Sequence, residues 1–200
     1  MTTQQLLEKL VSLKHKDREH LVFGAASHRY KLHGCLSDKE LSDFERRHSI
    51  RLPEDYRNFL QYAGNGGAGP AYGLLRLQEW NIEETEINSS RLATPFPHSQ
   101  AWNMTPLDET LSEDDYTTAL IEREAEYYKP DYVTGSMRIC HYGCAIYYLL
   151  VVSGPESGHI WVDDRASDNG VYPALHNTTH SRISFTDWYE EWLTENLSSH

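Results

Sequence analysis

The sequence predicts a single α+β domain in which helices pack against a mostly antiparallel β-sheet. Helical spacing of apolar residues, together with capping signals, marks residues 36–63 in the first half of the chain. In the second half, residues 145–152 and 159–162 are rich in β-branched and aromatic side chains and flank a Gly/Pro turn, as central strands do. The 200 residues fit one domain, and a domain of this size buries roughly 70% of its unfolded surface.

The N-terminal segment predicts an amphipathic helix, because leucines recur at helical spacing over residues 3–15. Residues 21–24 then suit either a short strand or a turn. We assign residues 1–33 to an N-terminal helix and extension, and residues 34–200 to the main domain. No repeat, low-complexity tract or linker separates the two, so we expect one globular unit.

The next helix has a clear start. Ser37 and Glu40 have the spacing of a capping box, in which each side chain accepts a hydrogen bond from the backbone N–H of the other residue. Leu36 before the cap and Leu41 inside the helix fit a hydrophobic staple. We therefore expect a helix that begins just after Ser37.

A further helix is predicted after Ile50. Pro53 suits its first turn, where the missing N–H costs nothing. Gly64 is placed to adopt the left-handed conformation that commonly ends a helix. The buried stripe of this helix is expected to consist of Tyr56, Phe59, Leu60 and Ala63.

The middle of the chain carries mixed signals. Residues 72–80 predict a strand with Leu75 and Leu77 on one face. Residues 88–107 are polar and contain three prolines, so we expect mostly loop there.

A helix is expected to begin at Ser112, because the acidic residues 113–115 favour a helix N-terminus. It should run to Tyr128 and stop before Pro130.

The second half predicts three successive strands, at residues 137–141, 145–152 and 159–162, with a turn at 153–158 between the last two. Ser184 then opens a last helix. The apolar side of that helix carries Phe185, Trp188, Trp192 and Leu193.

The formal charge of −12, from 18 basic and 30 acidic residues, bears on the partners of the chain. A surface this acidic repels phosphate backbones and anionic membranes, so we expect neither nucleic acid nor membrane as a partner. It would attract a basic partner. The alternative is that the acidity only keeps the protein in solution.

A cytoplasmic location is the expectation from targeting signals and cysteine usage. The N-terminus lacks a basic region followed by an apolar run, so it does not resemble a secretory signal. The longest apolar run, residues 145–152, is far below the ~20 residues that span a bilayer. Three cysteines cannot pair completely, which favours reduced thiols.

The usual signatures of catalysis are weak in this chain. Residues 64–69 match the letters of the dinucleotide fingerprint, but that mechanism needs a strand before the motif and a helix after it. Here a helix precedes the motif, so we expect a helix cap and a turn. The dipeptide at residues 153–154 lies in a hairpin turn and is no nucleophile elbow.

A metal site is the next possibility. Cys140, His141 and Cys144 offer soft ligands, but a structural zinc site normally has two ligand clusters. His176 and His180 would have to supply the second cluster, in an unusual arrangement. We expect instead small buried residues at strand ends, with no metal and no cofactor.

Three carboxylates lie close together at a predicted strand end. Asp163, Asp164 and Asp168 could bind a divalent cation or act as acid and base. The adjacent Arg165 can neutralise one of them. We expect the simpler arrangement, a solvated turn.

The order of the segments resembles the Smi1/Knr4 (SUKH) family. The resemblance rests on the capped helices and Asn-Gly-Gly turn of residues 37–67, on the strand–turn–strand segment 143–164, and on the aromatic helix around Trp188 and Trp192. It covers about residues 34–195. Residues 80–135 match no pattern of the family, so this member could differ from its relatives there.

The resemblance implies an α+β fold and a protein that is not an enzyme. In bacterial relatives the usual role is to bind and neutralise a toxin domain, commonly a nuclease. Eukaryotic relatives act as scaffolds in signalling, and a regulatory scaffold without a toxin partner is therefore the alternative function.

Physical chemistry adds that a toxin domain that cleaves nucleic acids tends to present a basic cleft, onto which an acidic inhibitor is steered. We therefore expect a basic toxin domain as the partner, contacted by carboxylates and by a few aromatic anchors. The candidate contacts are Glu83, Glu84, Glu86, Asp114, Asp115, Asp163 and Asp164, with Trp80 and Trp102 as anchors.

Overall fold

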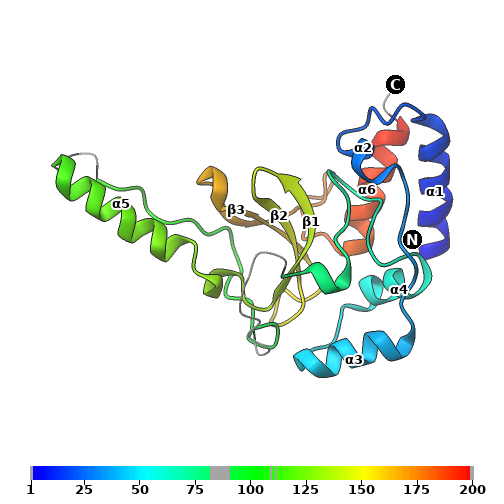
Figure 1. Cartoon of the computed structure of the whole chain (residues 1–200), viewed down its shortest axis with the longest axis horizontal. Helices are drawn as coiled ribbons and strands as arrows, with labels where there is room; N and C mark the ends of the chain where they lie inside the picture. Colours follow the sequence, from blue (N-terminus) through cyan, green and yellow to red (C-terminus); the bar gives the residue numbers. More distant parts are fainter. Residues whose placement is uncertain (1, 82–90, 109, 111, 199–200) are drawn as a thin grey trace.

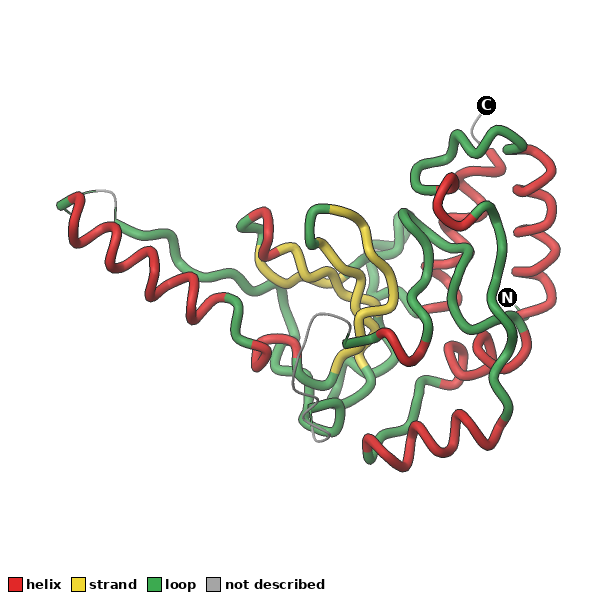
Figure 2. Tube along the Cα trace, in the orientation of Figure 1, coloured by secondary structure: helices red, strands yellow, loops and turns green. Residues whose placement is uncertain are grey.

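The computed structural model describes residues 2–81, 91–108, 110 and 112–198, and in these it has the predicted α+β architecture. Six α-helices, three short 3₁₀ helices and one four-stranded antiparallel sheet make up the described regular structure (Figures 1 and 2). The helices are α1 (Thr3–Lys16), α2 (Ala25–His28), α3 (Asp38–His48), α4 (Glu54–Tyr62), α5 (Glu113–Tyr127) and α6 (Phe185–Ser198).

The predicted helices are confirmed, and their caps explain where they begin. At α3 the Glu40 N–H donates to Ser37 Oγ (3.3 Å), and the Ser37 N–H donates to Glu40 Oε2 (2.8 Å), which completes the capping box. Pro53 occupies the N-cap of α4 instead of its first turn. Residues 21–24 form turns and bends, which decides between the two predictions for that segment.

The sheet follows the order of the chain: β1 (Ser136–Gly143), β2 (Ile146–Val151), β3 (Ile160–Asp164) and β4 (Gly170–Pro173), each antiparallel to its neighbour. The three strands that the sequence predicts are confirmed. The fourth was missed because its four residues begin with Gly and end with Pro, which are typical of turns.

The predicted strand over residues 72–80 is wrong. Leu75 donates a backbone hydrogen bond to Ile139 in β1 (2.8 Å), but no ladder continues from it. The Leu77 N–H instead donates to the Asn65 side chain (2.7 Å), and the chain turns into the short 3₁₀ helix η1 (Leu77–Glu79). The described residues of 88–107, from 91 onward, contain no helix and only one isolated bridge, as the loop prediction requires.

The sheet separates two cores, because neighbouring strand residues point to opposite faces. Leu150 and Ile160 face the helices, whereas Leu149 and Trp161 face the loop 91–103 and the 3₁₀ helix η2 (Pro130–Val133). The helix-side core is the larger and includes leucines of α1, so the N-terminal helix shares its core with the rest of the fold.

Helix α6 is the centre of the helical layer. Phe185 packs against Tyr56 and Phe59 of α4 at ring-centroid distances of 4.8 and 5.1 Å. On its other side α6 lies next to α1, where Lys9 Nζ and Glu190 Oε1 are 3.0 Å apart. Figure 1 shows α1, α2, α4 and α6 gathered at one end of the molecule, with α5 extending from the other.

Gly64 does not adopt the left-handed conformation predicted for it; Gly66 and Gly67 have the positive φ angles, 81° and 104°. The reason for glycine at position 64 is the close approach of another segment. A Cβ there would lie 2.6 Å from the His33 carbonyl oxygen and 2.8 Å from Leu32 Cβ.

We predict that Gly64→Ala lowers the free energy of unfolding by about 1–3 kcal/mol, because the backbone of residues 32–33 has to shift. Urea unfolding followed by tryptophan fluorescence measures it. Gly34→Ala is the matched control, since a Cβ at Gly34 meets no heavy atom within 4 Å. Equal stability of the two variants would contradict the prediction.

Candidate functional site

The exposed carboxylates predicted as contacts lie on an arm formed by α5. This helix projects away from the sheet (Figure 1), and Tyr127 is its only buried residue. Asp114 and Asp115 are exposed in the first turn, at the far end of the arm. Ser112 caps the helix by accepting from the Asp115 N–H (3.3 Å). These two aspartates are therefore presented to solvent on a regular, capped helix.

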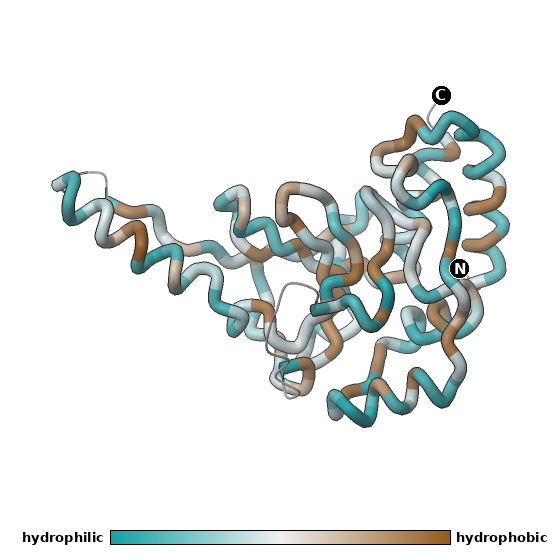
Figure 3. The backbone as a smooth tube through the Cα atoms, in the orientation of Figure 1, coloured by the Kyte–Doolittle hydropathy of each residue, from teal (hydrophilic) through white to brown (hydrophobic). Residues whose placement is uncertain are grey.

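Hydrophilic and hydrophobic residues are interspersed along the arm (Figure 3), and most of its hydrophilic residues are acidic. Its only basic residue is Arg123. The side chains of Tyr116 and Leu120 are 37% and 36% exposed, and Ile121 is 63% exposed. A helix that carries both kinds of side chain on exposed surface is suited to contact another protein. The acidic residues of α5 are Glu113, Asp114, Asp115, Glu122, Glu124 and Glu126.

The base of the arm is held by specific contacts. Arg123 lies over the Tyr127 ring (4.9 Å to the centroid) and forms an ion pair with Asp168 (3.3 Å). The Tyr127 hydroxyl donates to Asn103 Oδ1 (2.5 Å), and the Asn103 amide donates to the Asp168 carbonyl (2.6 Å). Asp168, which the sequence placed with Asp163 and Asp164, thus belongs to the base of the arm.

Asp163 is not in a solvated turn, so that prediction is wrong. It is 4% exposed and forms a bidentate ion pair with Arg165, with Nε–Oδ1 and Nη2–Oδ2 distances of 2.7 and 2.8 Å. The remaining Arg165 nitrogen, Nη1, donates to the carbonyls of Tyr127 (2.8 Å) and Lys129 (3.1 Å). The pair therefore links β3 to the C-terminal end of α5.

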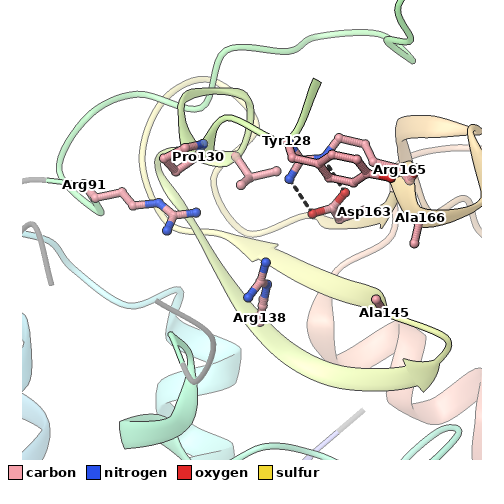
Figure 4. A pocket seen from close by; sticks show the side chains of 9 residues that line it. Arg91, Tyr128, Pro130, Arg138, Ala145, Asp163, Arg165 and Ala166 are labelled. Carbon is pink, nitrogen blue, oxygen red and sulfur yellow. Dashed lines mark hydrogen bonds and ion pairs between the residues drawn. The ribbon is translucent and has the colours of Figure 1, made fainter. Parts of the chain in front are cut away.

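A cavity of about 300 Å³ borders this pair (Figure 4). Arg91 and Arg138 reach into it from other segments, so its lining is basic although the chain as a whole is acidic. Burial and the nearby Arg138 and Arg165 lower the pKa of Arg91 to about 10, and it remains charged at neutral pH. In this structure Asp163 lies in the cavity lining with its charge already matched by Arg165.

Asp164 faces the opposite side of the sheet and is also buried, at 6% exposure. Its Oδ2 accepts hydrogen bonds from the Asn169 amide (2.9 Å) and the Tyr172 hydroxyl (3.1 Å). The solvated-turn prediction is wrong for this residue too. Neither Asp163 nor Asp164 presents a carboxylate on the open surface.

The two candidate aromatic anchors differ. Trp80 is 6% exposed and packs edge-on against the buried His48 (5.6 Å), which makes it a core residue. Trp102 is half-buried and stacks on Tyr132 at 4.1 Å, next to the base of the arm. Among the described candidates, then, Asp114 and Asp115 are exposed and Trp102 is partly so. Glu83, Glu84 and Glu86 lie outside the described residues.

No group of His, Cys, Asp and Glu within the described residues is arranged to hold a metal ion. Cys140 is buried, and burial raises the pKa of its thiol, whereas Cys35 and Cys144 are exposed.

None of the described helices has the length and apolar character needed to cross a bilayer. The Gly64–Gly69 segment precedes a turn and not a helix, so it does not form the dinucleotide-binding arrangement.

The structure also shows an exposed aromatic cluster, none of whose residues was among the predicted contact residues. The ring of Phe23 lies 5.4 Å from the rings of both Tyr72 and Tyr142, and the three residues are 53%, 45% and 43% exposed. They come from three distant segments, so no spacing in the sequence could have grouped them.

We predict that Asp163→Asn lowers the free energy of unfolding by about 3 kcal/mol, because it leaves the buried Arg165 guanidinium without its counter-ion. Asp168→Asn is the matched control: its carboxylate is exposed, so its loss should cost less than about 1 kcal/mol. Chemical unfolding of the three proteins makes the comparison. Similar losses of stability for both variants would show that the Asp163–Arg165 pair contributes no more to the free energy of unfolding than the exposed Asp168 carboxylate does.

Comparisons with known proteins place the chain in a family. No curated protein and no solved structure matches it. Residues 35–191, more than three quarters of the chain, match the SMI1 / KNR4 family (SUKH-1), in agreement with the resemblance that the motifs show. The chain belongs to the SMI1/KNR4 family (SUKH-1).

Proposed function

We propose that this protein is a non-enzymatic immunity protein that neutralises a cognate toxin domain by binding it directly, and that the toxin domain is basic and of the nuclease type. Family membership supports the general role, since SUKH proteins are typically immunity proteins. The observation that carries the more specific proposal is the acidic arm, α5, which places Asp114 and Asp115 where a partner can reach them.

The physical reason is electrostatic steering. A nuclease has to bind phosphates and therefore carries a basic surface. A partner with charge −12 is drawn toward such a surface, and the interaction acts mainly on the association rate. The exposed apolar residues of the arm, Tyr116, Leu120 and Ile121, would then lose contact with water when the complex forms.

The test is to purify the tagged protein from its native host and to identify by mass spectrometry what comes with it. We expect a single large protein, bound through its C-terminal domain, whose toxicity is suppressed when the two are produced together. Several unrelated signalling proteins, with no toxin among them, would instead favour the alternative of a regulatory scaffold.

With that domain purified, we predict that the double variant Asp114→Asn/Asp115→Asn associates at least about threefold more slowly at low ionic strength, and that added salt removes the difference. Stopped-flow measurements of the association rate give the answer. The amides keep the hydrogen bonds at the start of α5, so the helix should persist.

The control is Glu8→Gln/Glu19→Gln, which removes the same charge from exposed positions in and just after α1, at the other end of the molecule. If both double variants slow association equally, only the overall charge matters and the arm is not the contact. An association rate that does not depend on salt would remove the electrostatic argument altogether.

A further inference from the structure

One face of the sheet continues beyond the helices that cover it. Tyr148 of β2 pairs with Val162 of β3, and Val162 pairs with Tyr172 of β4, so the three side chains form a row across the sheet. They point to the same face as Leu150 and Ile160, which the helical layer buries. Trp188 of α6 still packs on Tyr148 (5.0 Å), and beside this contact the row borders an open groove.

The groove is a cavity of about 510 Å³ whose walls are apolar and aromatic apart from Asp164. Tyr142, Tyr148 and Tyr172 line it, and the rings of Tyr142 and Tyr148 meet edge to face at 6.2 Å. A second cavity of about 340 Å³ shares Tyr142 and Tyr148 and extends the groove along α6. Tyrosine is among the residues most enriched at binding hot spots.

The side chains that line the groove carry negative charge and no positive charge, although His176 Nδ1 lies 3.2 Å from the Glu191 carboxylate beside it. Asp164 is the only charged residue in the lining of the first cavity. The second cavity is lined by Glu191 and Glu195 from α6. Neither lining contains a lysine, arginine or histidine among the described residues, so the electrostatic complement of this surface is a cation.

The Asp164 carboxylate is incompletely satisfied. Oδ2 accepts two hydrogen bonds, but the buried Oδ1 has no hydrogen-bond partner among the described residues. A buried carboxylate oxygen without a partner is costly, and such groups normally find a donor or a positive charge. Gly170, which pairs with Asp164 across the sheet, adds no side chain above it.

The tyrosines around the carboxylate favour the same type of ligand. Burial and the Asp164 charge raise the pKa of Tyr172 to about 12, so its hydroxyl stays protonated and donates to Asp164 at neutral pH. Burial also raises the pKa of Tyr148. Neutral phenol rings attract cations over their faces, and arginine is the cation most often found there because its planar group stacks on them.

We propose that this groove binds a single arginine side chain of a partner protein, with the guanidinium between the tyrosine rings and paired with Asp164. The proposal deepens the proposed function, since it names one residue type of the partner and a second contact surface apart from the α5 arm. Contact with Oδ1 requires a ring at the rim to turn aside, a type of side-chain change that is common on binding.

The test uses a small probe and needs no toxin. The full ¹⁵N-labelled protein is titrated with the peptide acetyl-Gly-Arg-Gly-amide and followed by two-dimensional NMR. We expect saturable shifts at millimolar peptide, centred on the amides of residues 142–148, 162–164, 172, 174 and 175. The same peptide with citrulline in place of arginine has nearly the same shape but no charge, and should produce no such shifts. A lysine peptide should bind more weakly, since an ammonium cannot stack.

Two variants locate the site. Asp164→Asn should weaken binding of the arginine peptide at least about tenfold, whereas Asp168→Asn, which removes the same charge from an exposed position, should change it less than about twofold. Tyr142 is 43% exposed, so its replacement should not prevent folding. Tyr142→Ala should also weaken binding of the arginine peptide severalfold.

The proposal is overturned if the shifts scatter over the acidic surface, if citrulline and arginine act alike, if Tyr142→Ala leaves binding unchanged, or if no saturable shifts occur. The citrulline comparison and Tyr142→Ala still test the groove even if Asp164→Asn does not fold. No toxin is used in this test, so the two proposals can fail separately. If the groove binds arginine but the host contains no toxin partner, the groove proposal is supported and the immunity proposal fails.

Discussion

The position of α5 relative to the sheet depends on the ion pair and hydrogen bonds of the buried Arg165 guanidinium. It joins Asp163 on β3 to the carbonyls of Tyr127 and Lys129, where α5 ends and the chain enters η2. The last carbonyls of a helix have no partner inside it, and an arginine is suited to supply several donors at once. One side chain therefore satisfies a helix terminus, neutralises a buried carboxylate and sets the base of the arm relative to the sheet. Without it, the base of α5 would keep the contacts of Arg123 and Tyr127 but lose its link to β3.

The alternation of strand residues gives two neighbouring aspartates opposite roles. Asp163 points toward the smaller core and the arginines, and there its charge is matched. Asp164 points to the other face, where it meets tyrosines and no basic side chain of the cavity lining. A shift of register by one residue would exchange these environments. The same local sequence thus yields one carboxylate that stabilises the fold and one that is open to a role in binding.

Much of the fold could be predicted from the sequence because its signals are local. The capping box at Ser37 and Glu40, the leucine spacing of α1 and the β-branched runs of β2 and β3 each specify their element within a few residues. The predictions that failed concern residues whose conformation depends on contacts with distant segments. Residues 72–80 have the composition of a strand, but the Leu77 N–H bonds to the Asn65 side chain instead of to a neighbouring strand. Position 64 is glycine because residues 32–33 pass close by. β4 is too short to give a signal of its own.

The candidate site was harder to predict than the fold, for a physical reason. Net charge and acidic runs are visible in a sequence, but the exposure of each carboxylate is not, and Asp114 and Asp163 look alike until the sheet is formed. In the folded chain the buried Arg165 bonds to the end of the arm, while carboxylates line both the arm and the tyrosine groove. This distribution suits the proposed basic partner, because α5 carries a single basic residue and the described lining of the groove carries none, although Arg46, Arg57 and Arg182 pair with carboxylates elsewhere on the surface. The acidity of this chain is then better described by where its charges lie than by their sum.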